Sequence, residues 1–178
     1  MQDLYKNIIV NKLQSEFRFS NIHQVPKIIK IVINIGIGEA KDDIKILSKA
    51  MSELSAITGQ RPLICRAKKS ISSFKLRKNM PIGIKVTLRN IRMYEFLDKF
   101  INIAIPRIRD FRGISLNNFD KYGNLNIGIR EQYIFPEINI EDSDKSRGMN
   151  ISIITTSNHI NHSKRLLELL GLPFKNKL

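Results

Sequence analysis

Few residues of this chain have the type and spacing that catalysis or metal binding requires. The segment Gly36-Ile37-Gly38 is half of a dinucleotide-binding fingerprint, but Lys41 stands where G-x-G-x-x-G has its third glycine. His159 and His162 lie three residues apart, yet neither a cysteine nor a second histidine pair accompanies them as metal ligands. We expect the single cysteine, Cys65, to be a small buried hydrophobic residue. The sequence therefore predicts no cofactor, no metal site and no catalytic centre.

The chemistry that the sequence does supply is positive charge. Thirty Lys and Arg face sixteen Asp and Glu, which gives a formal net charge of +14. Clustered phosphates are the kind of partner that compensates such self-repulsion. No acid occurs from Leu54 to Tyr94, and this stretch carries ten basic residues: Arg61, Arg66, Lys68, Lys69, Lys75, Arg77, Lys78, Lys85, Arg89 and Arg92. The charge pattern favours a polyanionic partner.

The spacing of apolar residues predicts one α+β domain over residues 1–178. The length of 178 residues is typical of a single domain, and the apolar pattern switches repeatedly between the helical and the strand period. We expect four amphipathic helices: from about Asp3, a candidate N-cap, to Phe17; from Asp42 or Asp43 to Gly59; from Asn90 to before Pro106; and over residues 161–170. The first helix should turn Leu4, Ile8, Leu13 and Phe17 to one side. No apolar run approaches the roughly 18 residues that suggest a membrane span, so we expect no membrane partner.

Five strands are expected, over residues 28–36, 63–67, 82–89, 125–130 and 149–156. Their alternation predicts a mainly antiparallel sheet with about four helices packed on one apolar face. That face should hold Ile29, Ile31, Ile33 and Ile35 from the first strand and Ile82 from the third. The opposite face carries small polar and basic residues and no acid; its members include Lys30, Asn34, Arg66, Lys85, Thr87 and Arg89. An ordinary solvated face mixes both signs of charge, so we interpret this one as a platform for a polyanion.

A long basic loop is expected over residues 68–81, which match neither period. Its polar, basic and aromatic residues are Lys68, Lys69, Ser70, Phe74, Lys75, Arg77 and Lys78. Long loops inside compact domains are usually functional, although a disordered, solubilising segment is the alternative. A second basic group comprises Arg107, Arg109 and Arg112. An internal ion pair with Asp110 is the alternative to a partner contact there.

Several longer segments resemble the large-subunit ribosomal protein five family of bacteria and organelles. They are NIGIGEA at 34–40, TGQRPLI at 58–64, PIGIKVTLR at 81–89, AIPRIRDFRG at 104–113, GIREQYIFPE at 128–137 and RGM at 147–149. The resemblance covers essentially the whole chain. It implies an α+β fold with an antiparallel sheet, no enzymatic activity, and attachment of 5S rRNA to the large subunit in the central protuberance. It also implies that Asn34, Gln60 and Thr87 hydrogen-bond to 5S rRNA.

The same resemblance implies further partners. The basic loop would approach the elbow of P-site tRNA, and the neighbourhood of Arg109 and Arg112 would meet small-subunit ribosomal protein thirteen in an intersubunit bridge. Large-subunit rRNA and neighbouring ribosomal proteins would complete the set. From the charges themselves, we expect the following residues to neutralise phosphates, which the resemblance assigns to 5S rRNA: Lys30, Arg66, Lys85 and Arg89. An RNA-modifying enzyme and an RNA chaperone acting off the ribosome are the alternatives.

The composition also bears on the compartment. The chain has 31 Ile, 18 Lys and 16 Asn but only 4 Val, although Ile and Val are nearly equivalent in strands. Codon usage in an AT-rich genome accounts for this preference. We therefore expect a ribosome of a plastid or mitochondrion, with a bacterial cytoplasm as the alternative.

Overall fold

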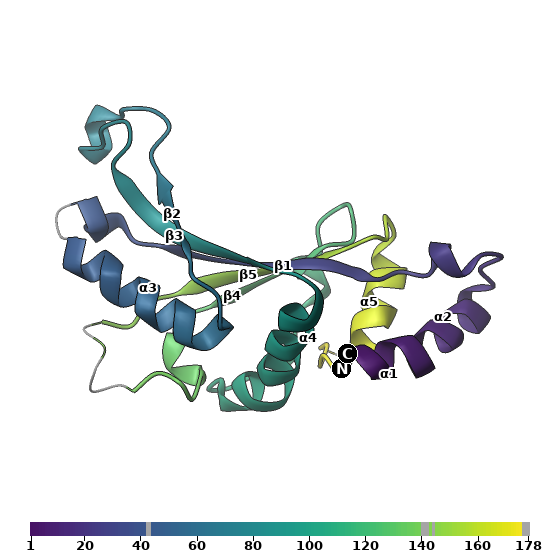
Figure 1. The fold of residues 1–178 in the computed structure, drawn as a ribbon. Coiled ribbons are helices and arrows are strands. Elements are labelled where there is room, and N and C mark those ends of the chain that lie inside the picture. Colours follow the sequence, from purple (N-terminus) through teal and green to yellow (C-terminus); the bar gives the residue numbers. More distant parts are fainter. Residues whose placement is uncertain (42–43, 140–142, 144, 176–178) are drawn as a thin grey trace. The chain divides into compact units, whose positions relative to one another are not determined.

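The computed structural model describes residues 1–41, 44–139, 143 and 145–175 (Figure 1). The chain divides into two compact units. Unit 1 comprises Met1–Ile31, Arg89–Ile127 and Ser152–Leu178, and unit 2 comprises Val32–Leu88 and Gly128–Ile151. The expectation of one domain over the whole chain stays a prediction, and each unit is described by itself below.

Five strands form an antiparallel sheet in the order β2-β3-β1-β5-β4. They span Ile28–Gly36 (β1), Leu63–Arg66 (β2), Pro81–Leu88 (β3), Leu125–Ile129 (β4) and Met149–Thr155 (β5). Each boundary lies within one residue of its predicted position, which is the usual uncertainty of strand ends. The predicted α+β class and five-stranded antiparallel sheet are confirmed.

In unit 2, helix α3 (Ile44–Thr58) contacts β3. Its buried apolar residues, Leu47, Ala50, Leu54 and Ile57, recur every three or four positions, as a helix with one apolar face requires. Gly59 ends the helix with a φ of 65°, a left-handed conformation that glycine adopts without strain. The predicted helix start at Asp42 or Asp43 lies outside the described residues.

The strands of unit 2 alternate between a buried and an open side. The buried side holds Ile33, Ile35, Ile84, Val86, Leu88, Ile129, Met149 and Ile151. Gly83 lets β3 lie close to β1, because a Cβ at this position would be 2.5 Å from the carbonyl oxygen of Ile35. Two predictions are wrong here: Ile82 is 37% exposed, and Cys65 is half-buried. Cys65 lies in β2, a strand at the edge of the sheet. None of the four residues of β2 is buried, because too little of the chain covers this strand.

In unit 1, the N-terminal helix contains a π-helical turn that the sequence pattern did not predict. Helix α1 (Gln2–Leu4) runs into this turn at Tyr5–Ile9 and continues as α2 (Val10–Phe17). A π-helical turn holds more residues than an α-helical one and rotates the side chains that follow. Ile8, which lies inside this turn, is therefore 58% exposed, whereas Ile9 and Val10 are buried. Leu4 precedes the turn and is 40% exposed, so the prediction for this residue is wrong as well. The N-cap is Met1 and not Asp3.

The other two helices of unit 1 follow the prediction closely. Helix α4 (Asn90–Lys99) continues as a π-helical turn to Ala104 and a 3₁₀ turn through Pro106. Its predicted apolar residues are all buried: Met93, Phe96, Leu97, Phe100, Ile101 and Ala104. Helix α5 (Ile160–Leu169) ends before Gly171, whose φ is 99°. Within the described residues, none of the helices is long and apolar enough to span a membrane.

At the start of β1 the predicted alternation is reversed. Ile28 is buried, and Ile29 is 44% exposed. Two consecutive residues, Ile29 and Lys30, thus lie outside the core, and strict alternation begins at Ile31. The strand begins where Lys27 pairs with Thr156, through the backbone bond from Thr156 N to Lys27 O.

Candidate nucleic-acid interface

The open side of the sheet in unit 2 is largely polar and its described residues include no acid, although the half-buried Val32 and the 62% exposed Leu63, which pairs with Lys85, also lie on it. We call the polar and glycine part of this surface the open face; it comprises Asn34, Gly36, Lys85, Thr87, Gly128 and Asn150. Thr87 is half-buried, and the others are exposed. Backbone alternation puts these residues opposite the buried side chains of the same strands. The predicted acid-free surface is therefore present in this unit.

Gln60 is joined to this surface at Thr87. The hydroxyl of Thr58, at the end of α3, donates to Leu54 O at 2.7 Å and accepts from Gln60 N at 3.3 Å. This turn directs the Gln60 side chain to β3, where Nε2 donates to Thr87 O at 3.2 Å. The bond uses one amide atom and leaves Oε1 out of it. Two of the residues that the resemblance assigns to 5S rRNA thus lie together.

Two predicted phosphate ligands belong to unit 1. Lys30 is half-buried in β1, and Arg89 is exposed at the N-cap of α4. Lys85 and Arg66 belong to unit 2, and both are exposed. Arg66 already has a protein partner, because its Nη1 donates to Asn79 O at 3.0 Å.

The predicted basic loop is an ordered extension of the β2–β3 hairpin. We call residues 67–80 the basic arm; it continues beyond the paired ends of β2 and β3 (Figure 1). Ile71 and Leu76 exchange two backbone bonds of 2.9 and 3.0 Å, which close the tip around a 3₁₀ turn at Ser72–Phe74. Lys78 N donates to Ser70 Oγ at 2.9 Å. These bonds give the arm a defined conformation.

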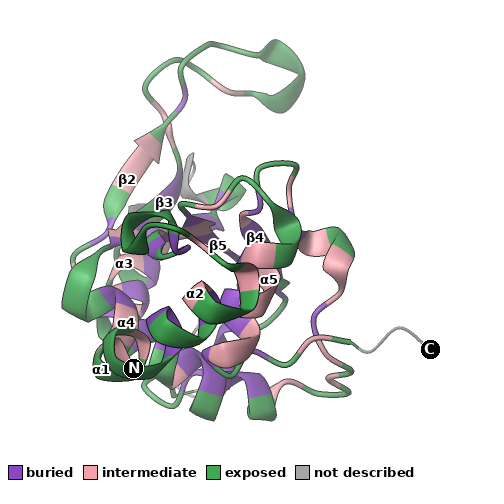
Figure 2. Cartoon of the chain, turned by 90° about the vertical axis from the view of Figure 1, so that its right-hand side faces the viewer, coloured by how far each residue is buried: buried purple, intermediate pink, exposed green. Residues whose placement is uncertain are grey.

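The basic arm is exposed along most of its length (Figure 2). All its predicted contact residues are exposed: Lys68, Lys69, Ser70, Phe74, Lys75, Arg77 and Lys78. Phe74 has 68% of its surface exposed. Five cations and an aromatic ring on one projecting segment are the groups that bind phosphates and stack on bases.

The second basic group lies in unit 1 after α4. Arg107, Arg109 and Arg112 are exposed. In the part of the chain that the structure describes, Asp110 forms no salt bridge with these arginines. The alternative of an internal ion pair is not realised, and Asp110 instead takes a left-handed φ of 53° in the turn.

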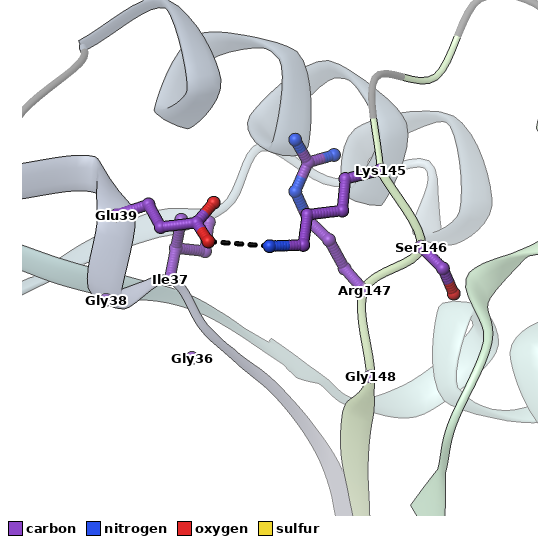
Figure 3. A pocket seen from close by; sticks show the side chains of 8 residues that line it. All are labelled: Gly36, Ile37, Gly38, Glu39, Lys145, Ser146, Arg147 and Gly148. Atoms are coloured by element: carbon purple, nitrogen blue, oxygen red, sulfur yellow. Dashed lines mark hydrogen bonds and ion pairs between the residues drawn. The ribbon is translucent and has the colours of Figure 1, made fainter.

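A cavity of about 540 Å³ lies in unit 2 between the end of β1 and the segment that precedes β5 (Figure 3). Its lining is Gly36, Ile37, Gly38, Glu39, Lys145, Ser146, Arg147 and Gly148. Lys145 Nζ reaches Glu39 Oε1 at 2.6 Å, and this hydrogen bond lowers the pKa of the Glu39 carboxyl. Both cations of the lining are paired with acids, so the cavity does not attract an anion by net charge.

A buried polar network behind this cavity was not predicted. Arg147 is 8% exposed and donates to Glu53 Oε2 at 3.1 Å. Glu53 also accepts from Gln132 Nε2 at 3.0 Å and from Ser143 Oγ at 2.8 Å. The partners of Glu53 lie 79 to 94 residues away along the chain. No local spacing signals such a contact.

The histidines belong to an aromatic cluster in unit 1. The His162 ring lies 4.4 Å from the Phe17 ring and 5.3 Å from the Phe19 ring, between centroids. Burial and the neighbouring His159 lower the pKa of His162. Among the described residues, no group of three His, Cys, Asp or Glu is placed to hold a metal ion. The cluster packs α5 against the end of α2.

A two-faced sheet whose open side offers amides, a hydroxyl and a cation without acids is typical of a nucleic-acid-binding protein. Comparison with known proteins makes this specific. A family model described as ribosomal protein L5 matches residues 21–77, and a second model, described as the C-terminus of the same ribosomal family, matches residues 81–174. The chain belongs to the ribosomal protein L5 family.

Three of the chain's relatives, each named large ribosomal subunit protein uL5, show the extent of the match. The proteins of a Synechococcus strain and of Caldanaerobacter subterraneus are each 58% identical over 174 residues, which is 98% of this chain and 97% of the relative. That of Synechocystis is 52% identical over 176 residues, 99% of this chain and 98% of the relative. These findings confirm a non-enzymatic ribosomal protein of the large subunit, located on the ribosome. The organellar compartment stays a prediction.

Proposed function

We propose that this protein binds 5S rRNA and helps to attach it to the large subunit in the central protuberance. The observation that carries the proposal is the contact between Gln60 and Thr87 at a sheet face that includes Asn34 and Lys85 and holds no acid. Membership of the L5 family supports the same partner.

On this proposal the polar residues and the cations have different roles. Asn34, Gln60 and Thr87 fix the register of the RNA by directional hydrogen bonds to sugars and base edges. Lys85, and in unit 1 Lys30 and Arg89, neutralise phosphates. Amide and hydroxyl groups on a rigid strand discriminate between RNA folds, whereas flexible lysines attract any RNA.

The proposal extends to two further contacts. The exposed cations and Phe74 of the basic arm suit the elbow of P-site tRNA. Arg109 and Arg112, which have no salt bridge to Asp110 in the described structure, suit the intersubunit bridge to small-subunit ribosomal protein thirteen.

The experiment is competitive binding of the purified protein to 5S rRNA against a scrambled RNA of the same length, at about 150 mM salt. We expect a preference of about tenfold or more, which corresponds to about 1.4 kcal/mol. Equal binding would leave only non-specific charge attraction and would refute the proposal. Retention on large subunits at high salt separates a structural component from a chaperone, which would wash off.

A further inference from the structure

The base of the basic arm has an irregular strand register. Leu63, Ile64 and Cys65 of β2 pair in step with Lys85, Ile84 and Gly83 of β3, but Arg66 pairs with Pro81. Ile82 is thus an extra residue on β3. A β-bulge of this kind bends a hairpin and increases its twist, so it sets the direction in which the arm leaves the sheet.

Asn79 lies on the arm side of this bulge, two residues before Pro81, in a left-handed conformation with a φ of 72°. Its backbone N–H donates to Ala67 O at 2.9 Å, and Ala67 N–H donates to Met80 O at 2.8 Å. Few residues other than glycine adopt this conformation readily, and asparagine is one of them. The carbonyl of Asn79 then accepts the bond from Arg66 Nη1 at 3.0 Å.

We propose that Arg66 is a positioning residue, whose bond to Asn79 O fixes the direction of the basic arm. The arm is internally closed at its tip by the bonds between Ile71 and Leu76. Any change in its direction would therefore turn the arm as one body about its base, where the bulge interrupts the register of the ladder. The bond from Arg66 to Asn79 O spans this base. Its role differs from the phosphate contact expected from the sequence.

The consequence concerns the cost of binding. A segment with several like charges resists close packing, and ordering a mobile segment lowers its affinity for a partner. An arm fixed in advance presents Lys68, Lys75 and Lys78 without that cost. This step rests on the proposed contact of the arm with tRNA, whereas the positioning role itself is a property of the free protein.

The experiment compares amide hydrogen exchange in the full-length free protein and in three variants. Arg66→Gln removes the guanidinium. Asn79→Ala strains the left-handed turn without a change of charge, and Asn79→Gly is its matched control, because glycine keeps the turn. In Arg66→Gln and Asn79→Ala we expect amide exchange at positions 67 and 79 to become roughly three- to tenfold faster. This is the effect that the loss of one hydrogen bond, or a strained turn, implies. Exchange at the tip amides of Ile71 and Leu76 should stay as in the parent protein.

RNA binding separates the positioning role from a phosphate contact. Arg66→Gln and Asn79→Ala should both weaken P-site tRNA binding to large subunits that carry them, and both should keep the affinity for 5S rRNA within about twofold. Asn79→Gly should change neither. Unchanged exchange at Ala67 and Asn79 would overturn the inference, and so would a loss of 5S rRNA affinity in Arg66→Gln that Asn79→Ala does not share. Failure of the parent protein to prefer 5S rRNA would instead refute the proposed function and leave the exchange result standing.

Discussion

Single polar side chains on the open face carry the proposed discrimination between RNAs. Thr87→Ala or Asn34→Ala removes one hydrogen-bonding group and should lower the affinity for 5S rRNA by roughly two- to tenfold, the value of one net hydrogen bond. Binding to a scrambled RNA of the same length should stay unchanged. Filter binding of both RNAs to each variant measures the ratio.

Lys69→Ala is the matched control for these variants, because Lys69 is an exposed cation of the basic arm and not of the open face. It should weaken contact with tRNA and spare 5S rRNA. Equal losses on 5S rRNA for Lys69→Ala and Thr87→Ala would contradict this division of roles.

Glu53 is the residue on which the buried network of unit 2 depends. Glu53→Ala leaves the Arg147 guanidinium, 8% exposed, without its counter-charge and deprives Gln132 and Ser143 of an acceptor. Breaking a buried pair on one side costs about 3–5 kcal/mol, so we expect the free energy of unfolding in urea to fall by about that amount.

Glu39→Ala is a useful comparison, since the Glu39–Lys145 pair is more than half exposed on both sides. It should leave the urea midpoint almost unchanged. A similar midpoint for both variants would show that the network of Glu53 does not stabilise the fold.

At the scale of the elements, His162 couples stability to pH. Burial lowers its pKa below the ordinary 6.5, so the unfolded chain binds the proton more tightly than the folded one. The contribution of neutral His162 is complete above about pH 6.5 and is lost as the pH falls through the lowered pKa of the folded state. Thermal melts from pH 7.5 to pH 5 should therefore show falling stability, with a shallower slope in His162→Phe.

His23→Phe is the control for this slope, because His23 is exposed and lies outside the cluster. Its melting curves should follow those of the parent protein over the same pH range. An unchanged slope in His162→Phe would mean that other groups carry the pH dependence.

The elements differ in how far the sequence specified them. Strand boundaries were predictable because a shift of one residue in a two-faced strand moves all its apolar side chains to the wrong side of the sheet. For the same reason, Lys85 and Thr87 lie on the side that the alternation of β3 predicted. The exposed Ile8 was not predictable, since a π-helical turn leaves no signal in a pattern of period 3.6. The site residues that follow from strand alternation could be predicted. Glu53 and Asn79 could not, because they act through tertiary contacts that leave no pattern of spacing in the local sequence.

For the whole molecule, the net charge of +14 should make RNA binding strongly dependent on salt. If about six to eight phosphates are contacted, the affinity for 5S rRNA should fall roughly a thousandfold between about 50 and 200 mM salt. Titrations at four or five salt concentrations give the slope. A nearly flat response would contradict the phosphate contacts of Lys85, Lys30 and Arg89.

The close approach of β3 to β1 at Gly83 has a consequence for the divergence of this sequence over time. A single added methyl group would meet a backbone oxygen at 2.5 Å, and a backbone atom cannot rotate away as a side chain does. Every substitution at this position must therefore push two strands apart, so inherited change at Gly83 should be eliminated. Gly36 and Gly38, with nothing within 4 Å of the added atom, are free of that restriction, and any purifying selection on them would come from partners outside the chain.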